Sequence, residues 1–198
     1  PEQAVVVASV GAEAEISSLV ATLKAQQYQV LRATTGEAEG FKHCYVEPHS
    51  LGVDRWLTML ALRSNQQTSV IIDAGTAFTM DVMDASGRHL GGWIAPGIKL
   101  MQQALTSRSE RLHVNQGWVT GSLGESTQDA IGLGCQAALQ GVFEQALVKV
   151  NALLPHTPFH LYVTGGDACY LNFERIDHYQ HRPLLVLEGL YTWWREQL

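Results

Sequence analysis

Apolar and polar residues alternate along the chain in runs that predict a succession of strands and helices. The first third predicts a buried strand over residues 4–10, then a helix carrying Ile16, Leu19, Val20 and Leu23, and then a short strand at 30–31. An aperiodic segment follows over 34–50, with a short strand expected around Tyr45. A further helix opens at 52–55. The polar stretch 64–68 ends this helix. It is the candidate boundary between two domains.

After this boundary the pattern of alternation restarts. It predicts strands at 70–72, 78–83 and 89–94, a helix over 98–112, a Gly- and Ser-rich loop over 117–126, a long helix over 127–154, a strand at 160–163, a Gly-Gly turn into a short helix, and a buried C-terminal helix over 184–194. Three consecutive strands followed by alternating helices and strands indicate a mixed α/β sheet. Its first three strands are expected to form an antiparallel meander.

Composition narrows the function classes. The chain has 198 residues, of which 46% are hydrophobic and 16% charged, so it can bury a core. Its 13 Lys and Arg against 19 Asp and Glu give a net charge of -6 without basic blocks, which argues against nucleic acid as the main partner. No apolar run is long enough for a membrane span, and no signal peptide opens the sequence. Three scattered cysteines fit reduced thiols, so a cytoplasmic location is expected.

The segment with the clearest chemical character is Asp73-Ala74-Gly75-Thr76, in which an acidic residue ends a buried strand and a Gly-Thr turn follows. Glycine permits close backbone approach, and the Thr76 hydroxyl beside free backbone N–H groups would form a small anion cradle. The Asp73 carboxylate could hold a cation or a water on that anion. A hairpin that uses Asp and Gly only for turn geometry explains the same residues.

Two further segments place glycine and aspartate at the start of a helix. In Gly52-Val53-Asp54-Arg55 the carboxylate either accepts a proton from a substrate hydroxyl, with the arginine binding an anionic group, or caps the helix. In Thr164-Gly165-Gly166-Asp167-Ala168 the bare backbone suits part of a nucleotide, and it equally suits a tight strand-to-helix connection. Each segment alone leaves both interpretations open.

Taken in order along the chain, the motifs resemble those of the type III pantothenate kinase family. The matching segments are Tyr45, Gly52–Arg55, Asp73–Thr79, Leu90–Ile98 (Leu-Gly-Gly-x-Ile-x-Pro-Gly-Ile), Ser126-Thr127, Thr164–Ala168 and Leu185–Leu190. They cover nearly the whole chain, and their order and spacing are more specific than any one of them. The resemblance implies an α/β fold of the acetate and sugar kinase, Hsp70 and actin superfamily, with two ribonuclease H-like domains over residues 1–67 and 68–198.

The resemblance also implies a reaction, in which ATP gives its γ-phosphoryl group to pantothenate to form 4′-phosphopantothenate, the first step towards coenzyme A. Asp54 matches the family's proton acceptor, and Asp73 its ligand for a monovalent cation, K⁺ or NH₄⁺. Substrate contacts match Tyr45, Gly52, Val53, Arg55 and Thr127, and the nucleotide side matches Gly75, Thr76, Gly165 and Gly166. Mg²⁺ is expected with ATP. The family pairs through its second half, so a homodimer is expected.

One part of the family pattern is expected to be missing. The family begins with a strand hairpin that carries a first phosphate loop, of the type Asp-x-Gly-Asn-Thr, whereas this chain has only the second loop at Asp73–Thr76. The first domain is therefore expected to lack about 40–50 residues, the length of two or three strands with their turns. Weak ATP binding and an unpaired sheet edge would follow.

Two other functions remain open at this point. One is a catalytically impaired accessory or regulatory homologue that binds pantothenate or a partner without turnover. The other is a related kinase of the same superfamily that acts on a different small hydroxyl substrate. Asp54, Asp73 and Thr76 favour a kinase, and only the Gly-x-Asp-Arg context favours pantothenate.

Overall fold

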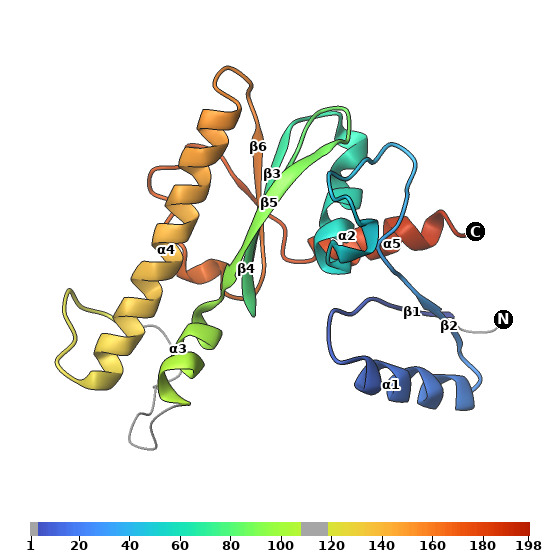
Figure 1. Cartoon of the computed structure of the whole chain (residues 1–198), viewed down its shortest axis with the longest axis horizontal. Coiled ribbons are helices and arrows are strands. Elements are labelled where there is room, and N and C mark those ends of the chain that lie inside the picture. The colour runs from blue at the N-terminus through green and yellow to red at the C-terminus, as the bar shows by residue number, and fades with distance from the viewer. Residues whose placement is uncertain (1–3, 108–118) are drawn as a thin grey trace. The chain divides into compact units, whose positions relative to one another are not determined.

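The computed structural model describes residues 4–107 and 119–198 of the chain. The helices are α1 Glu13–Ala25, α2 Val53–Leu62, α3 Ile98–Thr106, α4 Thr127–Leu153 and α5 Leu185–Arg195 (Figure 1). The strands are β1 Ala4–Val7, β2 Gln29–Arg32, β3 Ser69–Ala74, β4 Ala77–Met83, β5 His89–Pro96, β6 His160–Thr164 and β7 Gln180–His181. The protein is therefore of the mixed α/β class that the sequence predicts.

The chain divides into two compact units. The first unit contains the residues up to Gln67, the segment Met83–Gly91 at the tip of the β4–β5 hairpin, and the C-terminal segment Leu184–Leu198. The second unit contains Thr68–Val82 and Gly92–Pro183. Each unit is described by itself below.

In the first unit, β1 and β2 form a two-stranded parallel sheet connected by α1, with Val5 opposite Val30. The predicted strand over 4–10 ends at Val7, and the prediction that it is buried is wrong, because its residues are half-buried or exposed. No residue of α1 is buried either. A sheet of two strands connected by one helix has too few neighbours to bury its valines.

The core of the first unit is built from α2 and α5. Large side chains of α2 are at most 1% exposed, namely Trp56, Leu57, Met59, Leu60 and Leu62. Of the C-terminal helix, expected to be buried, only Leu185 and Gly189 are buried. The helix thus packs through one face, and apolar residues on its other faces, such as Leu187 and Tyr191, are exposed.

The segment between β2 and α2 does not form the strand predicted around Tyr45. It makes two isolated bridges, between Ala38 and Phe41 and between Lys42 and Arg88. The second bridge lays the segment on the hairpin tip, since Lys42 N–H donates to the Gly87 carbonyl (3.0 Å) and His89 N–H donates to the Lys42 carbonyl (2.8 Å). A single bridge is too short to extend into a strand. It still fixes where the residues after Lys42 lie.

The larger sheet has the strand order β5-β4-β3-β6-β7. The chain reverses at Gly75–Thr76 and again in a turn that is closed where Asp84 N–H donates to the Arg88 carbonyl (2.9 Å). Strands β3, β4 and β5 therefore run antiparallel, as predicted. By contrast β6 pairs parallel with β3. The carboxyl ends of β3 and β6 therefore meet at one edge, with Asp73 opposite Thr164.

Helices of the second unit also follow the predictions closely. The long helix expected over 127–154 is α4, which lies alongside the sheet in Figure 1. The helix expected over 98–112 is α3, which ends at Thr106, and residues 108–112 of that prediction lie outside the described residues. The first two residues of the predicted loop over 117–126 lie outside them as well.

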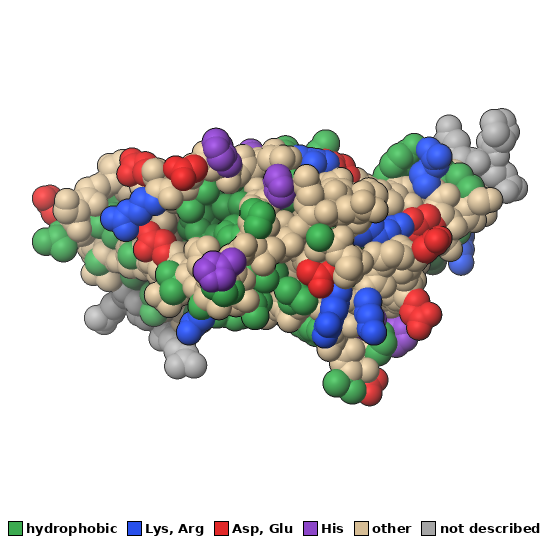
Figure 2. Space-filling model, turned by 90° about the horizontal axis from the view of Figure 1, so that it is seen from above, with side chains coloured by type: hydrophobic (Ala, Val, Ile, Leu, Met, Phe, Trp, Pro, Cys, Tyr) green, Lys and Arg blue, Asp and Glu red, His purple; other side chains and the backbone are tan. Residues whose placement is uncertain are grey.

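The surface in Figure 2 intersperses charges of both signs, with Lys and Arg side chains next to Asp and Glu. The three cysteines are free, and burial raises the pKa of the Cys135 thiol. Among residues 4–107 and 119–198, no helix is long and apolar enough to cross a bilayer.

Candidate active site

The first candidate site lies where α2 begins, and Gly52 shapes it. Gly52 is the N-cap residue, and the Asp54 carboxylate in the first turn accepts a hydrogen bond at Oδ1 from the Arg55 N–H (2.8 Å). A Cβ at position 52 would lie 2.6 Å from that Oδ1. Because glycine has no Cβ, the carboxylate can fold back over the start of the helix, where the unpaired N–H groups favour negative charge.

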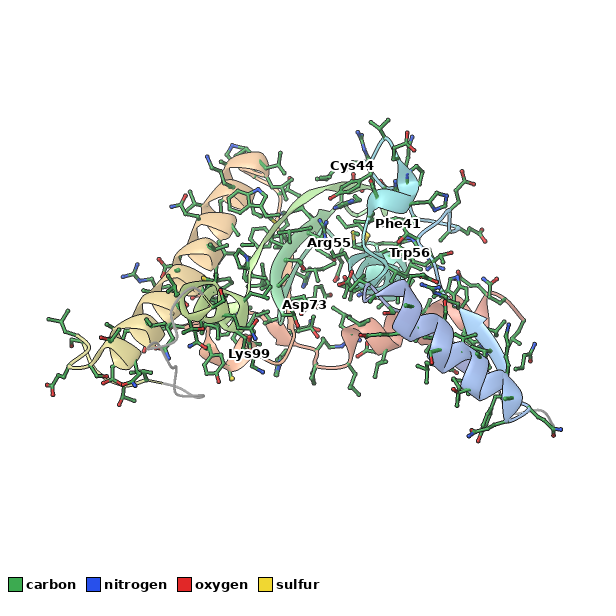
Figure 3. All side chains as sticks on the ribbon, turned by 60° about the horizontal axis from the view of Figure 1, so that its bottom comes forward. Phe41, Cys44, Arg55, Trp56, Asp73 and Lys99 are labelled. Atoms are coloured by element: carbon green, nitrogen blue, oxygen red, sulfur yellow. The ribbon has the colours of Figure 1, made fainter. Side chains whose placement is uncertain are left out.

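The next residue on α2 carries a buried positive charge. Arg55 is 4% exposed, and its Nη1 donates to the Tyr45 hydroxyl oxygen over 2.9 Å. Its guanidinium carbon lies 5.8 Å from the centre of the Tyr45 ring. Figure 3 shows Arg55 on α2. The structure thus brings Tyr45, 10 residues away in sequence, to the start of the helix that carries Asp54.

A cavity of about 300 Å³, lined by polar and apolar residues, opens beside this helix start. Its walls include Gly52 and Val53 together with residues 32–35 from the end of β2. The walls are held by hydrogen bonds, because the Thr35 hydroxyl donates to the Leu51 carbonyl (2.7 Å) and the His49 Nδ1 lies 3.0 Å from the Thr35 carbonyl oxygen. Five of the predicted site residues therefore lie together in the first unit: Tyr45, Gly52, Val53, Asp54 and Arg55.

A second candidate site lies in the second unit, at the edge where β3 and β6 end. Gly165 follows β6 with a φ of +92°, and a Cβ there would lie 2.2 Å from the Ala74 carbonyl oxygen and 2.4 Å from the Asp73 Oδ1. The backbone of the next turn is bonded to the same place, since Asp167 N–H donates to the Ala74 carbonyl (2.8 Å). Glycine at 165 is thus required by both its conformation and its closeness to Asp73.

The turn between β3 and β4 is held from the other side by Gly97, the N-cap residue of α3. Gly97 N–H donates to the Thr76 carbonyl (3.0 Å), and a Cβ at 97 would lie 2.0 Å from the Gly75 carbonyl oxygen. The expectation of free N–H groups in this turn is wrong for Gly75, whose N–H donates to the Ala77 carbonyl (3.0 Å) because it closes the turn.

Oxygen atoms dominate this second site. The Asp73 carboxylate and the carbonyls of residues 74–76 lie within one turn, and such oxygens are the ligands that hard cations prefer. Thr76 and Gly166 are exposed, so both are accessible. Nowhere in the described part of the chain do three or more His, Cys, Asp or Glu side chains gather. One carboxylate with backbone carbonyls suits a weakly bound monovalent cation better than a tightly bound transition metal.

The remaining predicted site residue, Thr127, belongs to neither group in the described contacts. It is exposed at the first position of α4. The cap of this helix is its neighbour Ser126, whose hydroxyl accepts from Asp129 N–H (3.1 Å) and donates to the Asp129 carboxylate (2.6 Å). The Thr127 hydroxyl is therefore not needed to cap the helix.

Two residues near these sites were not selected from the sequence. His89 is fully buried and stacks on Tyr45, with ring centres 5.9 Å apart. Asp167 is 8% exposed beside the β3–β4 turn. His89 gives no signal in the sequence, because its partner is far away along the chain. Asp167 belongs to the motif Thr164–Ala168, in which the sequence assigns a role only to Gly165 and Gly166.

Comparison with known proteins shows to which family the chain belongs. Residues 1–149 match the sequence profile of a family described as type III pantothenate kinase. The chain belongs to this family. Two type III pantothenate kinases illustrate the match: one from Pseudoalteromonas atlantica, 35% identical over 95% of this chain, and one from Alcanivorax borkumensis, 35% identical over 76% of it. The chain spans 77% of the length of the first relative and 61% of the second.

A solved structure is similar to this chain over its whole length. This protein from Campylobacter jejuni, described as a conserved Baf family transcriptional activator, superposes with a TM-score of 0.63 and 25% identity, covering 100% of this chain and 84% of its own. Membership of the type III pantothenate kinase family confirms the resemblance drawn from the motifs. It supports a pantothenate kinase, an enzyme class that uses ATP, and favours neither the accessory nor the alternative kinase function.

Proposed function

We propose that this chain transfers the γ-phosphoryl group of ATP to the hydroxyl of pantothenate. The observation that carries the proposal is the start of α2, where the Asp54 carboxylate lies next to the buried Arg55 that holds Tyr45. A carboxylate at this place can accept the hydroxyl proton, while Arg55 and Tyr45 offer donors to an anionic substrate. Family membership supplies the identity of the substrate.

The reaction assigns each group a part. Asp54 Oδ1 is engaged by Arg55 N–H, so Oδ2 accepts the proton from the pantothenate hydroxyl. The hydroxyl oxygen then forms a bond to the γ-phosphorus as the bond to the β,γ-bridging oxygen breaks, and ADP leaves. Such a transfer depends mainly on positioning and on neutralising phosphate charge. Tyr45, Gly52, Val53, Arg55 and Thr127 form the substrate side of the proposal.

The nucleotide side is proposed for the second unit. Thr76 and Gly166 are exposed there, and Gly75 and Gly165 leave room for close backbone approach. Asp73 with neighbouring carbonyls would hold a monovalent cation, K⁺ or NH₄⁺, and Mg²⁺ would enter with ATP to neutralise phosphate charge. Carboxylate and carbonyl oxygens are the donors that such hard metal cations prefer.

The finer architecture belongs to the same proposal. We infer two ribonuclease H-like domains, over residues 1–67 and 68–198, in a cytoplasmic homodimer. The division between Gln67 and Thr68 supports the boundary at that point, although Met83–Gly91 and Leu184–Leu198 group with the first unit. Exposed apolar residues on α4 and α5, such as Val148 and Leu187, are compatible with a subunit contact.

The test of the proposed function is ADP release measured with and without pantothenate, each in the presence and absence of K⁺. Release that requires pantothenate and rises with K⁺ is expected. A panel of other small hydroxyl compounds serves as the control for substrate class. Release that a different hydroxyl compound supports better than pantothenate would contradict the proposed substrate, and pantothenate binding without any ADP release would favour the accessory function.

Replacing Gly52 with alanine tests whether the Asp54 position matters. The added Cβ would collide with Oδ1 at 2.6 Å, and the carboxylate at the end of a flexible side chain must rotate away. We expect turnover to fall about tenfold or more, because small displacements of a catalytic group are costly, while stability changes by about 1 kcal/mol or less. ADP release and thermal unfolding measure the two effects.

The matched control is Gly36→Ala in the same unit. The nearest atom to a Cβ at position 36 is the Thr34 carbonyl oxygen at 3.9 Å, so alanine fits there. Wild-type turnover is expected for this control. If Gly52→Ala also turns over at the wild-type rate, the observed position of the Asp54 carboxylate is not the catalytic one.

A further inference from the structure

Tyr45 lies in a segment whose backbone is anchored at Lys42 by a single bridge, so the position of its ring depends on side-chain contacts. One contact is the hydrogen bond from Arg55 Nη1 to its hydroxyl (2.9 Å). The other is His89 at the start of β5, whose ring stacks on the Tyr45 ring at 5.9 Å with an angle of 26° between the planes. The tyrosine is thus held between a cation and an imidazole, both from elements that are buried at this point.

The imidazole itself is firmly placed. His89 has 0% of its surface exposed, and its main-chain N–H donates to the Lys42 carbonyl (2.8 Å). Its Nδ1 lies 3.6 Å from the Sγ of Cys44, the residue before Tyr45. Figure 3 labels Cys44 and Arg55 in this part of the first unit. One histidine therefore contacts both Cys44 and Tyr45, two successive residues of a segment that has no ladder of its own.

We propose that His89 is a positioning residue for substrate binding: it fixes the Tyr45 ring and, through the Tyr45 hydroxyl, the direction of the Arg55 guanidinium. This inference rests on the proposed function, because it assumes that Tyr45 and Arg55 receive pantothenate. Stacked aromatic pairs contribute about 0.5–1.5 kcal/mol beyond their buried area, which corresponds to about two- to tenfold in an equilibrium constant. His89 acts through Tyr45 and touches no reacting atom in this scheme.

The ring and the ring nitrogen of His89 can be tested apart. His89→Ala removes the stacking surface, whereas His89→Phe keeps a flat ring and removes the nitrogen near Cys44. The backbone bond to Lys42 is made by the main chain and remains in both variants. We expect His89→Ala to raise the Kd and the KM for pantothenate about three- to tenfold with little change in kcat. The phenylalanine variant should restore both constants to within about twofold.

The control is His160→Ala. His160 is exposed on β6 in the second unit, with its ring 6.5 Å from that of Tyr162, and it should leave pantothenate binding unchanged. Isothermal titration of the whole chain with pantothenate gives Kd. NMR of ¹³C-labelled tyrosine, with the Tyr45 signal assigned from Tyr45→Phe, reports the ring position without any ligand.

The outcomes separate the inference from the proposed function. A shifted Tyr45 signal and a raised Kd in His89→Ala, both rescued by phenylalanine, support the positioning role. An unchanged Tyr45 signal, or an unchanged pantothenate Kd in a folded His89→Ala protein, overturns it. A wild-type chain that binds no pantothenate contradicts the proposed function, and in that case the Tyr45 signal alone still decides whether His89 positions the ring.

Discussion

Replacing Asp54 with asparagine is expected to lower the kcat of pantothenate-dependent ADP release by about 10²- to 10⁴-fold, the usual contribution of a general base. The amide has the shape of the carboxylate, and its oxygen can still accept the hydrogen bond from Arg55 N–H that Asp54 Oδ1 accepts. The helix start should therefore keep its structure. What is lost is a group that can take a proton from the substrate hydroxyl.

Steady-state kinetics and pantothenate titration measure the two effects separately. The expected result is a large loss in kcat with a pantothenate Kd within about threefold of the wild type. The same chemical change at Asp177, an exposed residue in a loop of the second unit, is the control and should have no effect. If Asp54→Asn raises KM and leaves kcat unchanged, Asp54 binds the substrate and is not its proton acceptor. Wild-type kinetics would remove Asp54 from the site.

The start of α2 illustrates what sequence reasoning can predict. The apolar spacing after Gly52 predicts the helix, and the order of Gly, Asp and Arg carries the family resemblance. Both signals are local, because they depend on residues within one or two turns of each other. The same holds for the hairpin turns at Gly75 and Gly87, where glycine positions alone predict the reversal of the chain.

The contacts that hold Tyr45 illustrate what sequence reasoning cannot predict. The sequence predicts a strand around Tyr45, yet the segment forms only two isolated bridges, one of them to a hairpin tip more than 40 residues away. Its partner His89 is the first residue of a strand predicted from alternating apolar and polar residues, and nothing in that pattern marks the histidine as a functional residue. Contacts between distant segments leave no periodic trace in either segment.

Burial was overestimated at both ends of the chain for a related reason. Three successive valines at Val5–Val7 predict a buried strand, but burial depends on how many elements cover the sheet, and β1 pairs here with β2 alone. Similarly, the apolar run of α5 contacts its surroundings through one face. Hydrophobicity predicts which residues can be buried, whereas the neighbouring elements decide which of them are buried.

The contact that decides the position of α5 also gives the largest expected effect on stability. Gly189 of α5 lies against α2, and a Cβ at this position would lie 1.9 Å from the Leu57 carbonyl oxygen and 2.5 Å from its carbonyl carbon. Both atoms belong to the backbone of a helix whose Leu57 is 0% exposed, so neither can move aside cheaply. Gly189→Ala must push the two helices apart and is expected to lower the free energy of unfolding by about 2–3 kcal/mol.

The chain offers a matched control for this prediction in α4. Gly141 is also inside a helix, but a Cβ there meets nothing within 4 Å, so Gly141→Ala should raise the free energy of unfolding by about 0.5–1 kcal/mol through helix propensity. Urea unfolding followed by tryptophan fluorescence, to which the buried Trp56 of α2 contributes, measures both variants. Because α2 also carries Asp54 and Arg55, Gly189→Ala should reduce pantothenate binding as well, whereas Gly141→Ala should not. A Gly189→Ala protein as stable as the wild type would mean that α5 does not hold the helix that carries Asp54.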